Sequence, residues 1–200
     1  MRVCLGILVG IIFWNISAPA AAQADRPDCL LVAPDLVHSA YVRGEWRVVQ
    51  PSGLDKDANW LFSFGTGEAE ANRAVSVIRN YGFNKQCFIG RPSATFQYWL
   101  INNSGPIGDM DGEECFAFNP NNIKVSSVGD RWYALDGNQK VFIFKNEPDA
   151  IQAVRVIKQH KFYRRCWVGS PGQAMEYLLR SAKDTLPTGN IPCERFPNLC

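Results

Sequence analysis

The chain has 200 residues, of which 46% are hydrophobic and 12% aromatic. This composition excludes an intrinsically disordered protein, which has few large apolar residues and a high net charge. The formal net charge of +2 argues against nucleic acid and anionic lipid as main partners, because both need a concentrated basic surface. The seven cysteines are an odd number, so one of them needs a separate explanation in an exported protein.

Residues 1–24 have the pattern of a secretory signal peptide. Arg2 provides the positive start, residues 4–16 form a nearly continuous apolar run, and residues 22–24 form an A-x-A cleavage site. The apolar run is too short for a good bilayer-spanning helix. Cleavage would remove Cys4 and leave six cysteines in the mature chain. The pattern therefore predicts a secreted or periplasmic protein with no stable membrane insertion. An uncleaved anchor is the alternative.

The mature sequence contains one pattern twice. Cys29 and Cys115 begin the two copies 86 residues apart, and Trp46 and Trp132 have the same offset. After an insertion in the first copy at residues 50–59, the offset is about 79. The later matches include Phe62/Phe142, Phe64/Phe144, Glu68/Glu147, Ala71/Ala150, Ala74/Ala153, Val75/Val154, Ile78/Ile157, Phe83/Phe162, Cys87/Cys166, Gly90/Gly169 and Tyr98/Tyr177. So long a match predicts a tandem duplication.

The duplication groups the six remaining cysteines. Each copy has one cysteine near its start and one after its predicted helix, so the simplest pairs are Cys29 with Cys87 and Cys115 with Cys166. Cys193 and Cys200 are left to close a C-terminal loop. Pairing of a tail cysteine into one of the copies is the alternative.

Each copy reads as an α+β module. In the first copy, residues 37–42, 45–49, 60–64 and 86–89 are predicted strands, and residues 68–81 have apolar residues at helical spacing. The second copy follows the same order, with Asn146 as a predicted helix cap and an ambiguous segment at 173–181. We therefore expect two tandem homologous modules, each an antiparallel sheet with one helix packed on one face.

The predicted boundaries follow from the repeat and from turn-rich segments. They are a signal peptide at 1–24, a first module at 25–101, a linker at 102–112, a second module at 113–182 and a C-terminal tail at 183–200.

The combined pattern resembles an uncharacterised small module that recurs in exported bacterial proteins. The shared features are C-x-x-x-x-P at Cys29, a strand tryptophan at Trp46, F-x-F at Phe62, the apolar helix stripe, and F-x-x-x-C-x-x-G-x-P from Phe83. The resemblance covers about 160 residues. It implies export and duplication, and because the module has no established activity, it implies no catalytic residue.

The sequence offers little catalytic chemistry. No nucleophile, nucleotide-binding or zinc-protease motif is present, and no cysteine pair has metal-binding spacing, so we expect no cofactor and no metal. The two histidines, His38 and His160, are not matched by histidine in the other copy. These features favour a protein without catalytic activity.

Aromatic and basic residues are the candidate binding groups. Trp60, Trp99 and Trp167 have no tryptophan counterpart, and core tryptophans are expected to recur, so we predict that these three are exposed for binding. Arg91, with Lys85 nearby, makes the segment around the second cysteine basic, as do Lys161, Arg164 and Arg165 in the second copy. The alternatives are tryptophans that fill the module interface and a solvated basic face.

The leading functional hypothesis is therefore a secreted or periplasmic, non-catalytic binding protein for a protein or a cell-envelope glycan. A duplicated module suits such a role because it supports avidity or a composite groove. One alternative is a small hydrolase with His38 or His160 beside a carboxylate between the modules. Another is a protease inhibitor that presents the segment 50–59 as a rigid loop.

Overall fold

The computed structural model describes residues 28–51, 59–90, 94–108, 114–170 and 173–181. The predicted signal peptide, residues 52–58, Arg91, Cys193 and Cys200 lie outside these ranges. We call the described residues up to 108 the first half and those from 114 the second half.

The same order of elements occurs in both halves. The first half contains β1 (Asp28–Leu31), the 3-10 helix η2 (Pro34–Leu36), β2 (His38–Val42), β3 (Glu45–Gln50), β4 (Asn59–Ser63), α1 (Glu68–Tyr81), β5 (Lys85–Ile89) and β6 (Phe96–Leu100). The second half contains β7 (Glu114–Ala117), β8 (Lys124–Val128), β9 (Arg131–Asp136), β10 (Gln139–Phe144), α2 (Glu147–His160), β11 (Phe162–Ser170) and β12 (Gln173–Arg180). The segment that the sequence leaves ambiguous is strand β12.

The strands of the described chain form four antiparallel sheets of three strands each, so the α+β class is confirmed. Their orders are β2-β3-β4 and β1-β5-β6 in the first half, and β10-β9-β8 and β12-β11-β7 in the second. Each half thus has two small sheets where the sequence predicts one. The turns between consecutive strands explain the meander β2-β3-β4, whereas β1 joins β5 across the whole intervening helix.

The helices form where the apolar spacing predicts them, with different local signals at their ends. The side chain of Asn146 caps α2 by accepting a hydrogen bond from the backbone N–H of Asp149 at 2.9 Å. The residue before α1 is Gly67, which has no side chain to do the same. Both helices end in the left-handed conformation, at Gly82 in α1 and at Lys161 in α2.

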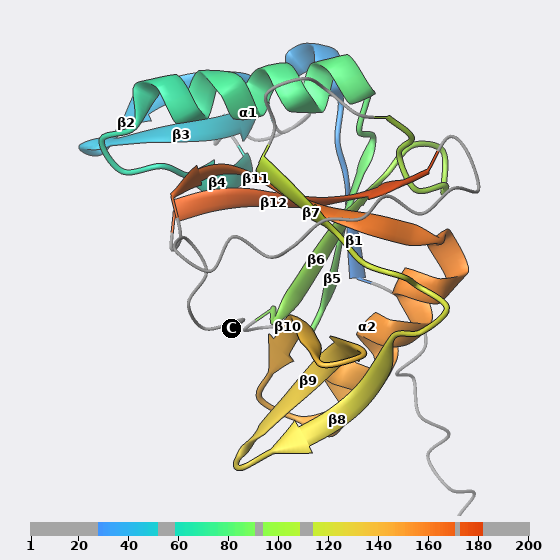
Figure 1. The fold of residues 1–200 in the computed structure, drawn as a ribbon. Coiled ribbons are helices and arrows are strands. Elements are labelled where there is room, and N and C mark those ends of the chain that lie inside the picture. The colour runs from blue at the N-terminus through green and yellow to red at the C-terminus, as the bar shows by residue number, and fades with distance from the viewer. Residues whose placement is uncertain (1–27, 52–58, 91–93, 109–113, 171–172, 182–200) are drawn as a thin grey trace, which may run out of the picture.

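The two hydrophobic cores exchange strands between the halves. One core contains the buried face of α1 together with Val168, Met175 and Tyr177 from β11 and β12 of the second half. The other core contains the buried face of α2 together with Ile89 and Phe96 from β5 and β6 of the first half. Figure 1 shows the exchange: α1 and β2–β4 lie against β11 and β12, and α2 and β8–β10 lie beside β5 and β6.

Strand alternation explains how one strand serves both cores. Successive side chains of a strand point to opposite faces of its sheet. In β6, Phe96 and Tyr98 belong to the core of α2, whereas Trp99 belongs to the core of α1. In β12, Tyr177 faces the core of α1 and Leu178 faces the core of α2. Both strands are therefore buried on both faces, and neither half encloses a core by itself.

The two predicted bridges within the copies are present. Cys29 lies directly opposite Cys87 in the β1–β5 pair, and Cys115 lies directly opposite Cys166 in the β7–β11 pair. Both pairs are disulfide-bonded, with sequence separations of 58 and 51 residues. Each bridge ties the start of a half to the strand that follows its helix.

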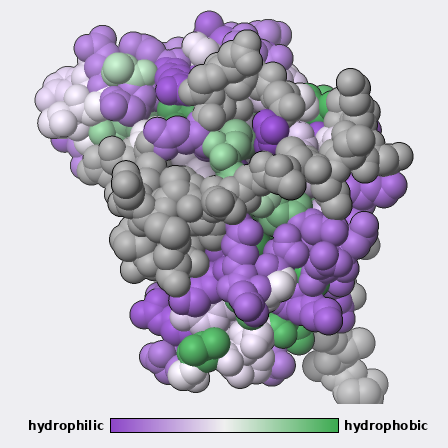
Figure 2. All heavy atoms as spheres, viewed as in Figure 1, coloured by the Kyte–Doolittle hydropathy of each residue, from purple (hydrophilic) through white to green (hydrophobic). Residues whose placement is uncertain are grey.

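The visible surface is mostly polar. In the face drawn in Figure 2, hydrophilic residues cover most of the described area and hydrophobic residues form separate spots. No helix among the described residues has the length and apolar character needed to cross a membrane.

Candidate functional site

A pocket of about 490 Å³ lies where the two halves meet, between α2 and the strands β5 and β6. We call it the interface pocket. Gln152, Arg155, Val156 and Gln159 line it from α2, at the i, i+3, i+4 and i+7 positions of one helix face. The remaining lining residues are Cys29, Lys85, Tyr98, Leu100, Asn103 and His160. Its volume is in the range of pockets that bind small molecules or sugar units.

The interface pocket has a positive and hydrogen-bonding lining. Lys85 and Arg155 are cationic, and Asn103, Gln152 and Gln159 provide side-chain amides. The ammonium of Lys85 donates a hydrogen bond to the side-chain oxygen of Asn103, which positions it at the rim of β5. None of the described lining residues is a carboxylic acid. This combination favours an anion that also has hydroxyl groups.

His160 forms part of the wall through ring contacts. Its ring centroid lies 5.8 Å from that of Tyr98, across the boundary between the halves, and 5.4 Å from that of Phe162. Burial lowers the pKa of His160, so the ring is neutral near pH 7. Burial raises the pKa of Tyr98 to about 12, so its phenol stays protonated. Both groups therefore face the pocket as neutral polar groups.

Neither histidine has the partner that the hydrolase hypothesis requires. Among the described residues, neither His38 nor His160 is hydrogen-bonded or ion-paired to a carboxylate. His38 lies on the exposed start of β2, with its Nδ1 atom 3.1 Å from the carbonyl oxygen of Leu36. The pocket thus lacks, in its described part, the acid–base pair of a hydrolytic site.

Two of the three candidate tryptophans are buried, so the prediction that they are exposed is wrong. Trp99 is 0% exposed and packs on Phe83 at 5.3 Å, and Trp167 is 4% exposed and packs on Phe116 at 5.4 Å. Both lie on strands with two buried faces, β6 and β11. An unmatched tryptophan fills core space here because each core combines different strands from the two halves.

Trp60 is the exposed member of the three, at 55% of its maximum. The guanidinium carbon of Arg47 lies 3.4 Å from the centre of its ring, so the protein's own cation covers one ring face. Arg91, the fourth predicted binding residue, lies outside the described residues. The structure does not bring the four predicted binding residues together in its described part.

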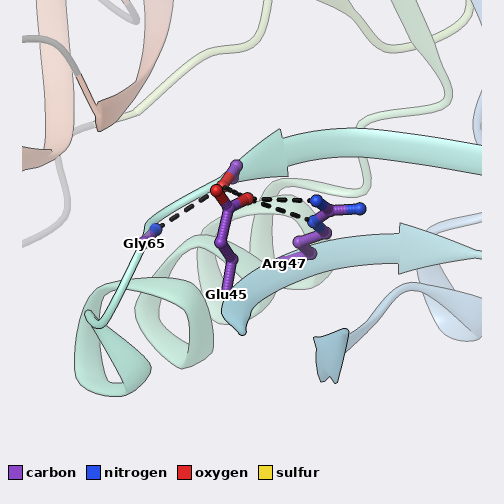
Figure 3. Close-up of polar contacts among 4 residues, drawn as sticks. Glu45, Arg47 and Gly65 are labelled. Carbon is purple, nitrogen blue, oxygen red and sulfur yellow. Dashed lines mark hydrogen bonds and ion pairs between the residues drawn. The ribbon is translucent and has the colours of Figure 1, made fainter. Parts of the chain in front are cut away.

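Arg47 belongs to a polar cluster that the sequence analysis did not find. Oε2 of Glu45 accepts hydrogen bonds from Nε and Nη2 of Arg47, at 3.3 and 3.1 Å, and from Oγ of Ser63 at 2.7 Å (Figure 3). The hydrogen bonds from Ser63 and Arg47 lower the pKa of Glu45. The sequence feature that could have predicted this pair is the i, i+2 spacing of Glu45 and Arg47, which places both side chains on one face of β3.

One of the predicted basic residues is used inside the fold. Arg165 donates to both carboxylate oxygens of Glu176, at 2.9 and 2.8 Å, and to the carbonyl oxygen of Val141. Its guanidinium also lies 4.1 Å from the ring centre of Phe142. Arg165 thus connects β11 and β12 to β10. Of the basic residues named from sequence that the structure describes, only Lys85 lines the interface pocket.

Comparison with known proteins gives no family assignment. No family model matches the chain, and no curated protein and no solved structure is significantly similar to it. Within the described residues, no group of three or more His, Cys, Asp or Glu side chains is placed to hold a metal ion. The pocket chemistry is therefore the basis for a functional proposal.

Proposed function

We propose that the protein is a secreted or periplasmic, non-catalytic binding protein whose ligand is an acidic cell-envelope glycan bound in the interface pocket. The observation that supports this is the lining: cationic and amide side chains with no carboxylate among the described residues. Amides pair with sugar hydroxyls, and Lys85 and Arg155 attract the acid groups.

Export is the setting that best fits the covalent structure. The two disulfides fit an oxidising compartment, and the apolar N-terminal segment with its A-x-A site fits a cleaved signal peptide. The recurring element order and the long series of matched residues support a tandem duplication, in keeping with the resemblance to a repeated module of exported bacterial proteins.

The alternative functions have less support. A hydrolase of the kind considered above needs a histidine–carboxylate pair, and neither histidine has one in the described chain. A protease inhibitor would present the segment 50–59, of which residues 52–58 lie outside the described ranges, while Gln50 donates a hydrogen bond to the carbonyl oxygen of Leu31 at 2.9 Å. Binding is supported by the lining of the interface pocket.

The test compares an acidic glycan with its neutral form. Oligogalacturonides and the same oligomers with methyl-esterified acid groups are titrated into the mature protein by calorimetry. We expect binding of the acidic form only, and about tenfold or more loss of affinity for Lys85→Gln, because a charge-assisted hydrogen bond contributes about 1.5–3 kcal/mol. Lys124→Gln, an exposed substitution on β8 outside the pocket, is the matched control.

Three results would contradict the proposal. One is equal affinity for the acidic and the esterified oligomer, which would remove the charge argument. Another is no binding of either oligomer to the wild-type protein. The third is an equal loss of affinity in Lys85→Gln and Lys124→Gln, which would place the ligand elsewhere.

A further inference from the structure

A second pocket, of about 650 Å³, lies over strands β9 and β10. We call it the β9–β10 pocket. Its lining residues are Ala94, Thr95, Arg131, Tyr133, Ile143, Phe144 and Lys145. It has no lining residue in common with the interface pocket, so an inference about it is independent of the proposed glycan site.

The pocket has two exposed cations at one end. Trp132 lies opposite Phe144 in the β9–β10 pair, so the antiparallel register places Arg131 opposite Lys145. Like charges directly opposite each other on neighbouring strands are destabilising. Among the described residues, neither Arg131 nor Lys145 has an ion-pair or side-chain hydrogen-bond partner. This end of the pocket therefore favours a negatively charged group.

The equivalent position of the first half already contains such a group. The 86-residue offset places Glu45 at the position of Arg131 and Arg47 at that of Tyr133. There the carboxylate of Glu45 accepts hydrogen bonds from Arg47 and Ser63 (Figure 3). The second half has lost the internal carboxylate and the internal partners at the same strand positions.

The rest of the β9–β10 pocket is apolar and aromatic. Tyr133 and Ile143 lie directly opposite each other and are half-buried, and Nζ of Lys140 lies 5.5 Å from the centre of the Tyr133 ring. The hydroxyl of Thr95 already donates to Oδ2 of Asp149 at 2.9 Å, so it adds little polar capacity. A ligand with only a charge would leave this surface uncovered.

We infer that the β9–β10 pocket binds an amphipathic carboxylate, with the carboxylate between Arg131 and Lys145 and an apolar group over Tyr133 and Ile143. The carboxylate supplies the negative charge that Glu45 supplies from within the first half. Such a group is available from a free aryl or alkyl acid and from the C-terminus of a peptide with an apolar last residue.

The experiment uses matched acids and amides on the mature, disulfide-bonded protein. The probes are 3-phenylpropionate, the tripeptide acetyl-Gly-Gly-Phe with a free carboxylate, and the amide of each. Backbone amide shifts are followed by NMR up to about 10 mM probe, which detects dissociation constants in the millimolar range. We expect shifts in β9 and β10 with at least one acid and about tenfold or more weaker binding of its amide.

Substitutions locate the site. Arg131→Gln is expected to weaken acid binding about tenfold, and Arg131→Glu, which introduces the first half's residue, to abolish it. Lys124→Gln, an exposed substitution on β8 outside both pockets, is the control and should leave the acid affinity unchanged. The acid with the higher affinity identifies the source: the tripeptide indicates a protein C-terminus, and phenylpropionate indicates a small acid.

Equal binding of acid and amide to the wild-type protein would overturn the inference, and so would the absence of shifts in β9 and β10 with both acids. Both comparisons use unmodified protein, so they hold even if a variant fails to fold. An equal loss of acid affinity in Arg131→Gln and Lys124→Gln would also count against the assignment.

Discussion

The two halves of the molecule place different chemistry at equivalent positions of the same elements. In the sheet β2-β3-β4 of the first half, Glu45 and Arg47 form an ion pair with each other. The corresponding residues of the second half, Arg131 and Tyr133, line the β9–β10 pocket. At the end of each helix, Tyr81 packs on Tyr177 at 5.9 Å, and the equivalent His160 packs on Tyr98 at 5.8 Å. The ring contact is kept, but only the second half has a titratable imidazole there.

The comparison separates core positions from pocket positions. Residues that are alike in both halves, such as the cysteines, the helix alanines and the strand tyrosines, form the cores and the bridges. Residues that differ and are exposed, such as Arg131, line pockets. Difference alone is not sufficient, because Trp99 differs from its counterpart and is fully buried.

The largest effect is expected from the unmatched tryptophan in the core. Trp99 and its counterpart Leu178 are both 0% exposed, in opposite cores. Trp99→Ala should lower the free energy of unfolding by about 3–5 kcal/mol and Leu178→Ala by about 2–5 kcal/mol, because each leaves a cavity. Trp60→Ala, on the exposed partner of Arg47, should cost no more than about 1 kcal/mol.

Chemical denaturation followed by fluorescence and circular dichroism measures these differences. A cost for Trp99→Ala as small as that of Trp60→Ala would contradict the placement of Trp99 in the core of α1. It would also restore the hypothesis that all three unmatched tryptophans serve binding.

The two disulfides should contribute almost equally. Their loops of 58 and 51 residues are similar, so the entropy of loop closure in the unfolded chain differs by only about 0.1 kcal/mol between them. We expect Cys29→Ser/Cys87→Ser and Cys115→Ser/Cys166→Ser each to lower the free energy of unfolding by about 2–4 kcal/mol.

Each sheet that contains a disulfide also contributes to the core of the other half. Either pair of substitutions should therefore lower the midpoint temperature, or increase the width, of a single unfolding transition measured by calorimetry. Two separate calorimetric transitions, one of which is unchanged from wild type, would show that the halves fold independently and would contradict the exchanged cores.

The smallest expected effect is a pH dependence of the free energy of unfolding that comes from His160 of the second half. Lys85 of β5, Tyr98 of β6 and Arg155 of α2 line the same pocket as His160, whose folded-state pKa is lowered by burial. Below its unfolded pKa of about 6.5, the unfolded chain binds more protons than the folded protein, so the free energy of unfolding falls as the pH falls.

His160→Tyr, which introduces the residue of the first half, should remove this part of the pH dependence between about pH 7.5 and about pH 5.5. His160→Gln, which also lacks the imidazole ring, serves as the matched variant and should remove the same part of the slope. An unchanged slope in His160→Tyr would mean that His160 titrates alike in the folded and unfolded states.

Local structure could be predicted from the sequence because it depends on short-range signals. The helix at 68–81, the cap at Asn146 and both pairs of core cysteines follow from periodicity, capping and repeat offsets. The exchange of strands between the cores could not be predicted. Strands β6 and β12 have apolar residues on both faces, and periodicity does not tell which helix each face contacts.

The pockets were missed for the same reason. Lys85 was noticed as part of a basic segment, but Arg155 becomes its neighbour only when α2 of one half packs against β5 and β6 of the other. The difference between the paired Glu45 and Arg47 and the corresponding Arg131 and Tyr133 becomes visible only after the strand register is known.

The most direct test of the account is an NMR titration of the mature protein with acidic oligogalacturonides, read at equivalent positions of the two halves. The account predicts shifts at Lys85, Asn103 and His160 that saturate together. It predicts no comparable shifts at Arg164 and Tyr81, which are the equivalents of Lys85 and His160 around the other helix. Equal shifts around both helices, or none at Lys85 and His160, would contradict it.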